Sequence, residues 1–306
     1  MSYRPVMMSV DRILFPTDGS DAAGHARRHA QYLADHFDAT LHVVHVTERD
    51  DKASTDVLGV EAAEVLEDLH SIQTAALSLP VARVRERSVV SSTATGGILN
   101  YVVQYDIDLV VMGTHGRRGV RRLLLGSVAE EVVRKAPCPV VTVGRGAVPP
   151  ERMEAGTLLL PVDFSEQRFR LLEHARELVP LYDMELTVLH VVQVRGLPDA
   201  YGRPARESDS GLMADRAQTV LDEEVESLRE SGFNVNVEVR MGPAAATILD
   251  MAAETEAALI LIATHGRTGL ERMLMGSVAE TVIRQAPCPV FAVKSFGRSL
   301  VSNDED

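Results

Sequence analysis

Three glycines and a serine in the stretch Gly113–Ser127 have a spacing that suits the binding of a phosphate group. They follow the pattern G-x2-G-x9-G-S directly after the apolar run Leu109–Met112. Glycine lets the backbone turn and approach a ligand closely, because it has no Cβ atom. The pattern ends at the predicted helix Ser127–Lys135, whose first N–H groups and positive dipole end favour an anion. The stretch therefore predicts a phosphate-binding loop in front of a helix that is capped by serine.

The chain contains this stretch twice. Residues Thr114–Val140 recur as Thr264–Val290, displaced by 150, and the turn that contains Asp18 recurs at Asp163, displaced by 145. A repeating unit of roughly 140 residues has the size of a domain, so the chain is a tandem duplication. The expected parts are a first domain over 1–146, a linker over 147–156, a second domain over 157–297 and an acidic tail over 298–306, of which Val301–Asp306 are expected to be unstructured.

Short apolar runs alternate with segments of helical periodicity in both halves. This order calls for a parallel sheet covered by helices on both faces. We therefore predict an α/β fold of two tandem doubly wound, Rossmann-like domains, each a five-stranded parallel sheet of order 3-2-1-4-5. The predicted strands are Arg12–Thr17, Thr40–Thr47, Val81–Val89, Asp108–Met112, Val140–Val143, Thr157–Val162, Glu185–Val192, Asn234–Arg240, Leu259–Ala263 and Val290–Val293. The predicted helices are Asp21–Phe37, Asp56–Leu77, Thr95–Tyr105, Ser127–Lys135, Glu166–Leu178, Met213–Glu230, Ala244–Glu254 and Ser277–Arg284.

This topology brings Asp18 and the glycine loop to one crevice. Asp18 follows the first strand and Gly113 follows the fourth, and ligands of doubly wound sheets bind beyond the carboxyl ends of strands where the strand order reverses. The Asp18 carboxylate could cap the turn before the first helix, or it could hold Mg²⁺ or a sugar hydroxyl. The strand Val81–Val89 is more polar than the others, which places it near a sheet edge.

Composition limits the partners and the compartment. The net charge of −13 argues against sequence-independent binding of nucleic acid or of an anionic membrane surface, and no apolar stretch is long enough to span a bilayer. Cys138 and Cys288 occupy equivalent positions of the repeat, which indicates small core residues and not a disulfide. We expect a cytoplasmic protein.

Catalytic and metal-binding patterns are missing from the sequence. His25 and His29 are four residues apart on a predicted helix, but Arg170 replaces His25 in the second half and no further ligand is evident, so no metal site is expected. Gly19–Gly24 has the glycine spacing of a Walker A loop without its lysine. With no nucleophile elbow and no paired carboxylates, we expect no catalytic residues.

The aspartate turn, the glycine spacing and the repeated Ala-Pro-Cys-Pro-Val ending together resemble the universal stress protein family, UspA-like, in its tandem two-domain form and its ATP-binding branch. The resemblance covers Arg12–Val143 and Thr157–Val293 and implies an adenine nucleotide, ATP with or without Mg²⁺, in each domain. The residues that it implies around the nucleotide in the first half are Asp18, Leu41, Met112, Gly113, His115, Gly116, Gly126, Ser127 and Val128. The equivalent residues in the second half are Asp163, Leu186, Ile262, Ala263, His265, Gly266, Gly276, Ser277 and Val278.

The second half departs from the glycine pattern at Ala263, which stands where the first half has Gly113. If this position requires a positive φ or a very close ligand, the added methyl group weakens the site. An arginine cluster in the first loop, Arg117–Arg122, is also diluted in the second half. We therefore expect the first site to bind the nucleotide more tightly.

Three functions remain open from the sequence. The favoured one is a cytoplasmic stress-response protein, not an enzyme, in which ATP is a regulatory and stabilising ligand. The alternatives are an interaction scaffold that does not depend on nucleotide and a slow Mg²⁺-dependent ATPase. We expect the two domains to pack as a pseudo-dimer through their last strands, Val140–Val143 and Val290–Val293, and two chains could associate further as a homodimer.

Overall fold

The computed structural model of the chain describes residues 8–49, 83–114, 125–144, 147–193, 207–264, 275–294, 296 and 298–301. Its first half contains the strands β1 (Arg12–Pro16), β2 (Thr40–Glu48), β3 (Val84–Ser91), β4 (Leu109–Gly113) and β5 (Val140–Val143). The helices of that half are α1 (Asp21–His36), α3 (Ala94–Gln104) and α4 (Ser127–Lys135). A 3₁₀ turn, η1 (Pro150–Arg152), lies in the segment that joins the halves. The helix that we predict over Asp56–Leu77 lies outside the described residues.

The second half repeats this order of elements. Its strands are β6 (Thr157–Val162), β7 (Glu185–Val192), β8 (Val235–Met241), β9 (Leu259–Ala263) and β10 (Val290–Val293). Its helices are α5 (Gln167–Tyr182), α6 (Glu207–Glu230), α7 (Ala244–Glu254) and α8 (Ser277–Gln285).

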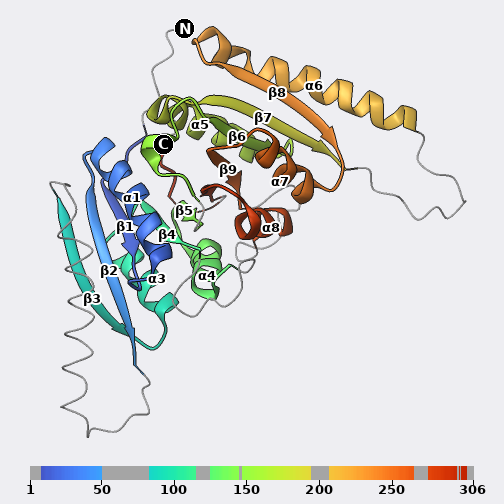
Figure 1. Cartoon of the computed structure of the whole chain (residues 1–306). Coiled ribbons are helices and arrows are strands. Elements are labelled where there is room, and N and C mark those ends of the chain that lie inside the picture. The colour runs from blue at the N-terminus through green and yellow to red at the C-terminus, as the bar shows by residue number, and fades with distance from the viewer. Residues whose placement is uncertain are drawn as a thin grey trace, which may run out of the picture.

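The strands of both halves form one ten-stranded sheet, in the order β3-β2-β1-β4-β5-β10-β9-β6-β7-β8 (Figure 1). Each half has the predicted strand order 3-2-1-4-5, and all neighbours within a half are parallel. The polar strand β3 lies at one outer edge of the sheet, as its composition predicts. The α/β fold that we predict is confirmed.

The two halves join where β5 and β10 run antiparallel, with Val141 opposite Phe291. These are the last strands of the two repeats, at which we expected the contact. Both residues are buried, at 3% and 2% exposure. Burial of such side chains on both faces of a sheet stabilises it by the removal of apolar surface from water.

Helices cover both faces of the sheet and bury two separate cores. One core contains residues from α1, α5 and α6, and the other contains residues from α3, α4, α7 and α8. Each core includes residues of both halves. Cys138 and Cys288 lie in the second core as free, buried thiols, so the predicted role of small core residues is confirmed.

The C-terminal segment differs from the expected tail. Residues 298–301 return to the first half, where the Ser9 N–H donates to the Leu300 carbonyl at 3.0 Å and Met8 forms an antiparallel bridge with Val301. Leu300 and Val301 are 2% and 4% exposed. The prediction of an unstructured segment over Val301–Asp306 is therefore wrong for Val301, whose side chain is buried together with that of Leu300, and the rest of that segment lies outside the described residues.

Candidate functional site

The carboxyl ends of β1 and β4 form the edge on which the candidate site lies. The two strands are parallel neighbours, with Leu14 opposite Val110. They also mark the point at which the strand order reverses, since β1 connects through α1 to β2 on one side and β4 lies on the other. Asp18 follows β1 and Gly113 ends β4, so the topology brings both to the same edge, as we predict from the sequence.

Hydrogen bonds within its own turn hold Asp18 in place. Its Oδ1 accepts from the Ser20 N–H at 3.0 Å, and the Ser20 Oγ caps α1 by accepting from the Ala23 N–H. The turn is anchored to β2 through the buried His45, whose Nδ1 lies 2.9 Å from the Thr17 carbonyl oxygen. Asp18 itself is half-buried. Of the two roles left open by the sequence, the turn-stabilising one is visible directly.

Gly126, and not Ser127, is the N-cap of α4. Gly126 has φ −62° and ψ 139°, and no side chain of the described residues accepts a hydrogen bond from the first N–H groups of this helix. Ser127 is the first helical residue, and it is exposed. The prediction of a serine cap is therefore wrong in both halves, because Gly276 and Ser277 repeat the arrangement.

The start of α4 differs from the starts of the other described helices of its half. Ser20 caps α1, and Thr93 caps α3 by accepting from the Gly96 N–H at 3.0 Å. Glu48 adds a second acceptor at α3, for the Ala94 N–H. An uncapped helix start leaves N–H groups and a positive partial charge for an external acceptor. In the second half none of α5, α7 and α8 has a side-chain cap, so the contrast is specific to the first half.

Gly126 connects this helix start to the end of β4. Its N–H donates to the Thr114 carbonyl at 2.7 Å, and Thr114 donates in turn to the Val143 carbonyl of β5. Gly276 and Thr264 make the same bonds in the second half, at 2.8 and 2.9 Å. The two ends of the glycine loop are therefore fixed to each other in the same way in both halves.

Gly113 and Ala263 have the same backbone conformation. Each is the last residue of its strand, paired with Val143 and Val293 respectively. Neither is among the described residues with a positive φ, so alanine adds no backbone strain here. Of the three reasons to expect a weaker second site, the φ argument is therefore wrong. The close approach of a ligand and the diluted arginine cluster remain as reasons.

Leu41 and Leu186 do not lie at this site. Leu41 is the second residue of β2, opposite Ile13, and it is fully buried at the amino end of the sheet. Leu186 has the same place in β7, at 1% exposure. Both side chains belong to the core that α1, α5 and α6 cover. The assignment of these residues to a nucleotide is wrong, because a core leucine at the opposite edge cannot contact the ligand.

Val46 and Val191 are the residues that β2 and β7 bring to the carboxyl edge. The register pairs Pro16 with Val44, so Val46 lies just beyond the end of β1 and is half-buried. Sequence reasoning missed this role. The signal was present, since His45-Val46 recurs as His190-Val191 at the displacement of the Asp18 turn, and both histidines bond the residue before the aspartate.

The other predicted site residues divide into two groups. Met112 and Ile262 are buried next to the end of their strands, at 5% and 4% exposure, and Val128 and Val278 are half-buried in the first turn of α4 and α8. His115, Gly116, His265 and Gly266 lie outside the described residues, as does the arginine cluster.

His29 contacts the segment that joins the halves. Its Nε2 lies 3.1 Å from the Val148 carbonyl oxygen, and burial lowers its pKa to about 4. Within the described ranges, no three side chains of histidine, cysteine, aspartate or glutamate gather as they would around a metal ion. No helix in those ranges is long and apolar enough to cross a membrane.

Comparison with known proteins identifies the family. The profile described as "Universal stress protein family" matches residues 9–144 and again residues 155–294. The chain belongs to the universal stress protein family. Its two halves are the two copies of the universal stress protein domain.

The chain is also similar to individual universal stress proteins. One from Methanocaldococcus jannaschii is 34% identical over 137 residues, which cover 45% of this chain and 81% of that protein. One from Mycobacterium tuberculosis is 29% identical over 198 residues, which cover 63% of each protein, so the match spans less than two thirds of that relative.

Among solved structures, a universal stress protein from Archaeoglobus fulgidus superposes with a TM-score of 0.63 at 24% identity, over 94% of this chain and 98% of that chain. A functionally unknown protein from Pseudomonas aeruginosa gives a TM-score of 0.66 at 18% identity, over 94% and 93%. These two likenesses show that this universal stress protein shares its fold with both of these proteins.

Proposed function

We propose that this universal stress protein binds an adenine nucleotide, ATP, at the carboxyl edge of β1 and β4, more tightly in the first half than in the second. ATP acts there as a regulatory and stabilising ligand in a cytoplasmic stress response. The observation that carries the proposal is the uncapped start of α4, which follows the glycine loop directly and lies at the edge that Asp18 and Gly113 share.

The chemistry of these groups fits the parts of a nucleotide. The N–H groups at the start of α4 and the glycine backbone suit phosphates, because they offer donors without a competing side chain. Asp18 suits a sugar hydroxyl or a Mg²⁺ ion held by phosphates. Val46 and Met112 offer apolar surface at the same edge for a base.

We favour a ligand role over catalysis. A general base must lie within hydrogen-bond reach of the attacking water, but the described Asp18 carboxylate accepts from the Ser20 N–H of its own turn. The alternative for the second half is an interaction scaffold that binds no nucleotide, because the methyl group of Ala263 obstructs the close approach of a ligand there. A slow Mg²⁺-dependent ATPase is the third candidate, and turnover lost in Asp18→Ala would favour it.

Gly126→Val tests the first site without a change in the fold. Gly126 has φ −62° and ψ 139°, which valine adopts without strain, so the added side chain obstructs the phosphates and leaves the helix intact. We expect the nucleotide released from the denatured, purified protein to fall from about one per chain to almost none. The rise in melting temperature that ATP causes should be lost as well.

Gly276→Val is the matched control, because Gly276 has the same backbone conformation in the second half. It should leave most of the bound nucleotide in place. Equal nucleotide content in the wild type and in Gly126→Val, with both proteins folded, would contradict the assignment of the first site. Equal losses in the two variants would contradict the preference for the first half.

A further inference from the structure

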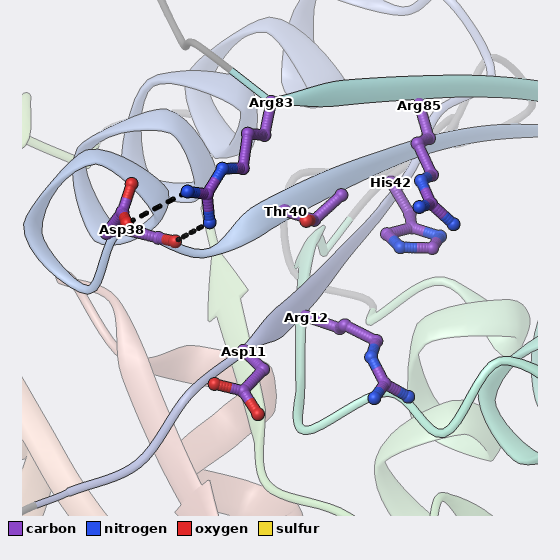
Figure 2. Close-up of a pocket in the computed structure, with 7 residues that line it drawn as sticks. All are labelled: Asp11, Arg12, Asp38, Thr40, His42, Arg83 and Arg85. Atoms are coloured by element: carbon purple, nitrogen blue, oxygen red, sulfur yellow. Dashed lines mark hydrogen bonds and ion pairs between the residues drawn. The ribbon is translucent and has the colours of Figure 1, made fainter.

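A small cavity opens at the amino ends of β1, β2 and β3, at the edge of the sheet opposite to the candidate nucleotide site (Figure 2). Its volume is about 210 Å³, which is below the range of roughly 300–1,000 Å³ typical of pockets for drug-sized ligands. A ligand of this cavity is therefore smaller than a nucleotide. The lining residues are Asp11, Arg12, Asp38, Thr40, His42, Arg83 and Arg85.

His42 brings a buried polar atom to this cavity without a partner. The residue is 1% exposed, and its Nδ1 lies 2.9 Å from the Tyr101 hydroxyl. Its Nε2 is buried and has no hydrogen-bond partner among the described residues. The Tyr101 hydroxyl has no other acceptor in that set, so we infer that it donates to Nδ1, which leaves the ring hydrogen on Nε2. An unsatisfied buried donor costs free energy and indicates an acceptor that binds there.

Arg85 places a cation beside this ring. It pairs with His42 in the register of β2 and β3, so the two side chains share a face of the sheet, and Figure 2 shows them next to each other. Within the described ranges Arg85 makes no hydrogen bond and no ion pair. Burial, followed by the charges of Arg85, Arg12 and Arg87, lowers the pKa of His42 to about 4. The lining therefore has three arginines against two aspartates, Asp11 and Asp38, and is net positive, with the neutral His42 Nε2–H as a further donor.

The other two arginines of the lining, Arg83 and Arg12, each contact a protein group. Arg83 is turned toward Asp38, at 3.3 Å, but both side chains are more than half exposed (Figure 2). Exposed ion pairs contribute roughly 0–1 kcal/mol, so Arg83 can exchange this partner for a ligand at little cost. Arg12 donates to the Tyr105 carbonyl at 3.0 Å, which fixes its position at the rim.

The second half lacks the histidine and the three arginines of the lining, although it keeps an aspartate, Asp183, at the position of Asp38. The strand registers place Thr187 at the position of His42, Asn236 at that of Arg85 and Asn234 at that of Arg83. Asn234 donates instead to Glu185, at 2.6 Å. Because the second half forms the same sheet without them, the fold does not require a buried histidine and an arginine cluster at this edge.

We propose that this cavity is a binding site for a small phosphate dianion, either inorganic phosphate or the phosphate of a small monoester. The fork of an arginine guanidinium matches phosphate oxygens in geometry and charge. Arg85 on β3 and His42 on β2 lie side by side on one face of the sheet, so the guanidinium and the Nε2–H can donate to different oxygens of one phosphate. The site is independent of the nucleotide site at the other edge.

Phosphate titration of the labelled full-length chain tests this site, with the His42 ring signal in the NMR spectrum as the reporter. The His42 signal is the one that is absent from the spectrum of His42→Gln. If that variant does not fold, the signal is instead identified by the change of its chemical shift in Tyr101→Phe. At constant ionic strength in chloride, phosphate should shift the signal along a saturable curve. The loss of a charge-assisted bond in Arg85→Gln should weaken binding about tenfold or more.

Asn236→Gln is the control, since Asn236 occupies the position of Arg85 in the second half, and it should leave the titration unchanged. Glycerol phosphate is titrated in parallel. Tighter binding than that of inorganic phosphate assigns the site to a monoester, and weaker binding assigns it to the free ion. A His42 signal that does not respond to either anion overturns the proposal. A response that is equally strong in Arg85→Gln also overturns it.

Discussion

The two candidate nucleotide sites differ by one methyl group, the Cβ of Ala263, at the end of the fourth strand of each half. Because neither Gly113 nor Ala263 has a positive φ, exchange of the two residues tests ligand approach without backbone strain. We expect Ala263→Gly to tighten ATP binding in the second half and Gly113→Ala to weaken it in the first, each about fivefold, or roughly 1 kcal/mol. Calorimetric titration of both variants measures this, and unchanged affinities would show that the ligand lies away from this position.

Buried neutral histidines make the stability of the protein dependent on pH. His29 and His174 have pKa values lowered from 6.5 to about 4, mainly by burial. Between these values the unfolded chain binds protons that the folded chain does not. The contribution to stability is therefore complete above pH 6.5 and is lost as the pH falls toward 4.

Each of these histidines should lower the free energy of unfolding by about 1.4 kcal/mol per pH unit in that window. Urea unfolding at several values between pH 7 and pH 4.5 measures the slope. His174→Gln should reduce the slope by the contribution of one residue, whatever its effect at neutral pH. The same slope in this variant and in the wild type would show that His174 is protonated in the fold.

The sequence predicted correctly that Gly113 lies at the end of a strand and Gly126 at the start of a helix, but it chose a β2 residue at the opposite edge of the sheet. The role of the two glycines in binding a nucleotide stays a prediction, which rests on their spacing. Leu41 carries no such signal, because a leucine in an apolar strand is as common in a hydrophobic core as in a binding site. The pairing of Pro16 with Val44 places Val46 at the site edge, in agreement with the repeat of His45-Val46 in the second half.

At the scale of elements, the packing of α3 against β2 depends on Gly97. A Cβ at this position would lie 2.6 Å from Cγ1 of Val46, a stiff branched side chain at the site edge. Gly24 in α1 has nothing within 4 Å of such a Cβ and is exposed. The two helices therefore offer opposite environments for the same substitution.

We expect Gly97→Ala to destabilise the protein by about 1 kcal/mol, because the overpacking cost of 1–3 kcal/mol exceeds the gain in helix propensity. Gly24→Ala should stabilise it by about 0.5–1 kcal/mol through propensity alone. Chemical denaturation of both variants compares them directly. A stabilised Gly97→Ala protein would show that α3 moves away from β2 without cost.

Element types were predictable from periodicity, but some ends were not. The helix α5 continues through Pro180 to Tyr182, four residues beyond its predicted end. Proline removes one helical hydrogen bond. That loss is offset by the burial of Leu181 and Tyr182, and Tyr182 stacks on Tyr32 of α1 with ring centroids 5.1 Å apart. Contacts between the halves therefore set this helix end, and a local sequence window does not contain them.

At the scale of the whole molecule, the C-terminal segment ties the second half to the first. Arg298 donates to the carboxylates of Asp106 and Asp108, and its backbone N–H donates to the Pro137 carbonyl at 2.7 Å. Asp108 is only 11% exposed, and its other oxygen accepts from the backbone of Asp11 and Arg12. Arg298 therefore completes a network that organises the start of β1.

We expect Arg298→Ala to lower the free energy of unfolding by about 1–2 kcal/mol, because it leaves the half-buried Asp108 without its cationic partner. Arg240→Ala is the control, since Arg240 pairs with Glu238 and Glu254 on an exposed surface and should cost less than about 0.5 kcal/mol. Urea unfolding gives both values. Equal changes in the free energy of unfolding would mean that the Arg298 contacts with the first half do not stabilise the protein.

The antiparallel seam between β5 and β10 has a consequence for the history of the chain. In a symmetric pair of identical subunits every substitution appears twice, so neither copy can lose a function alone. Here the two copies lie on one polypeptide, whose tether holds them together at an effective concentration on the order of millimolar, at any dilution. The chain thus acts as a heterodimer of fixed one-to-one stoichiometry. The two copies can therefore differ, as they do where Ala263 corresponds to Gly113 and where Thr187 and Asn236 correspond to His42 and Arg85. A single gene can in this way carry two modules with different sites.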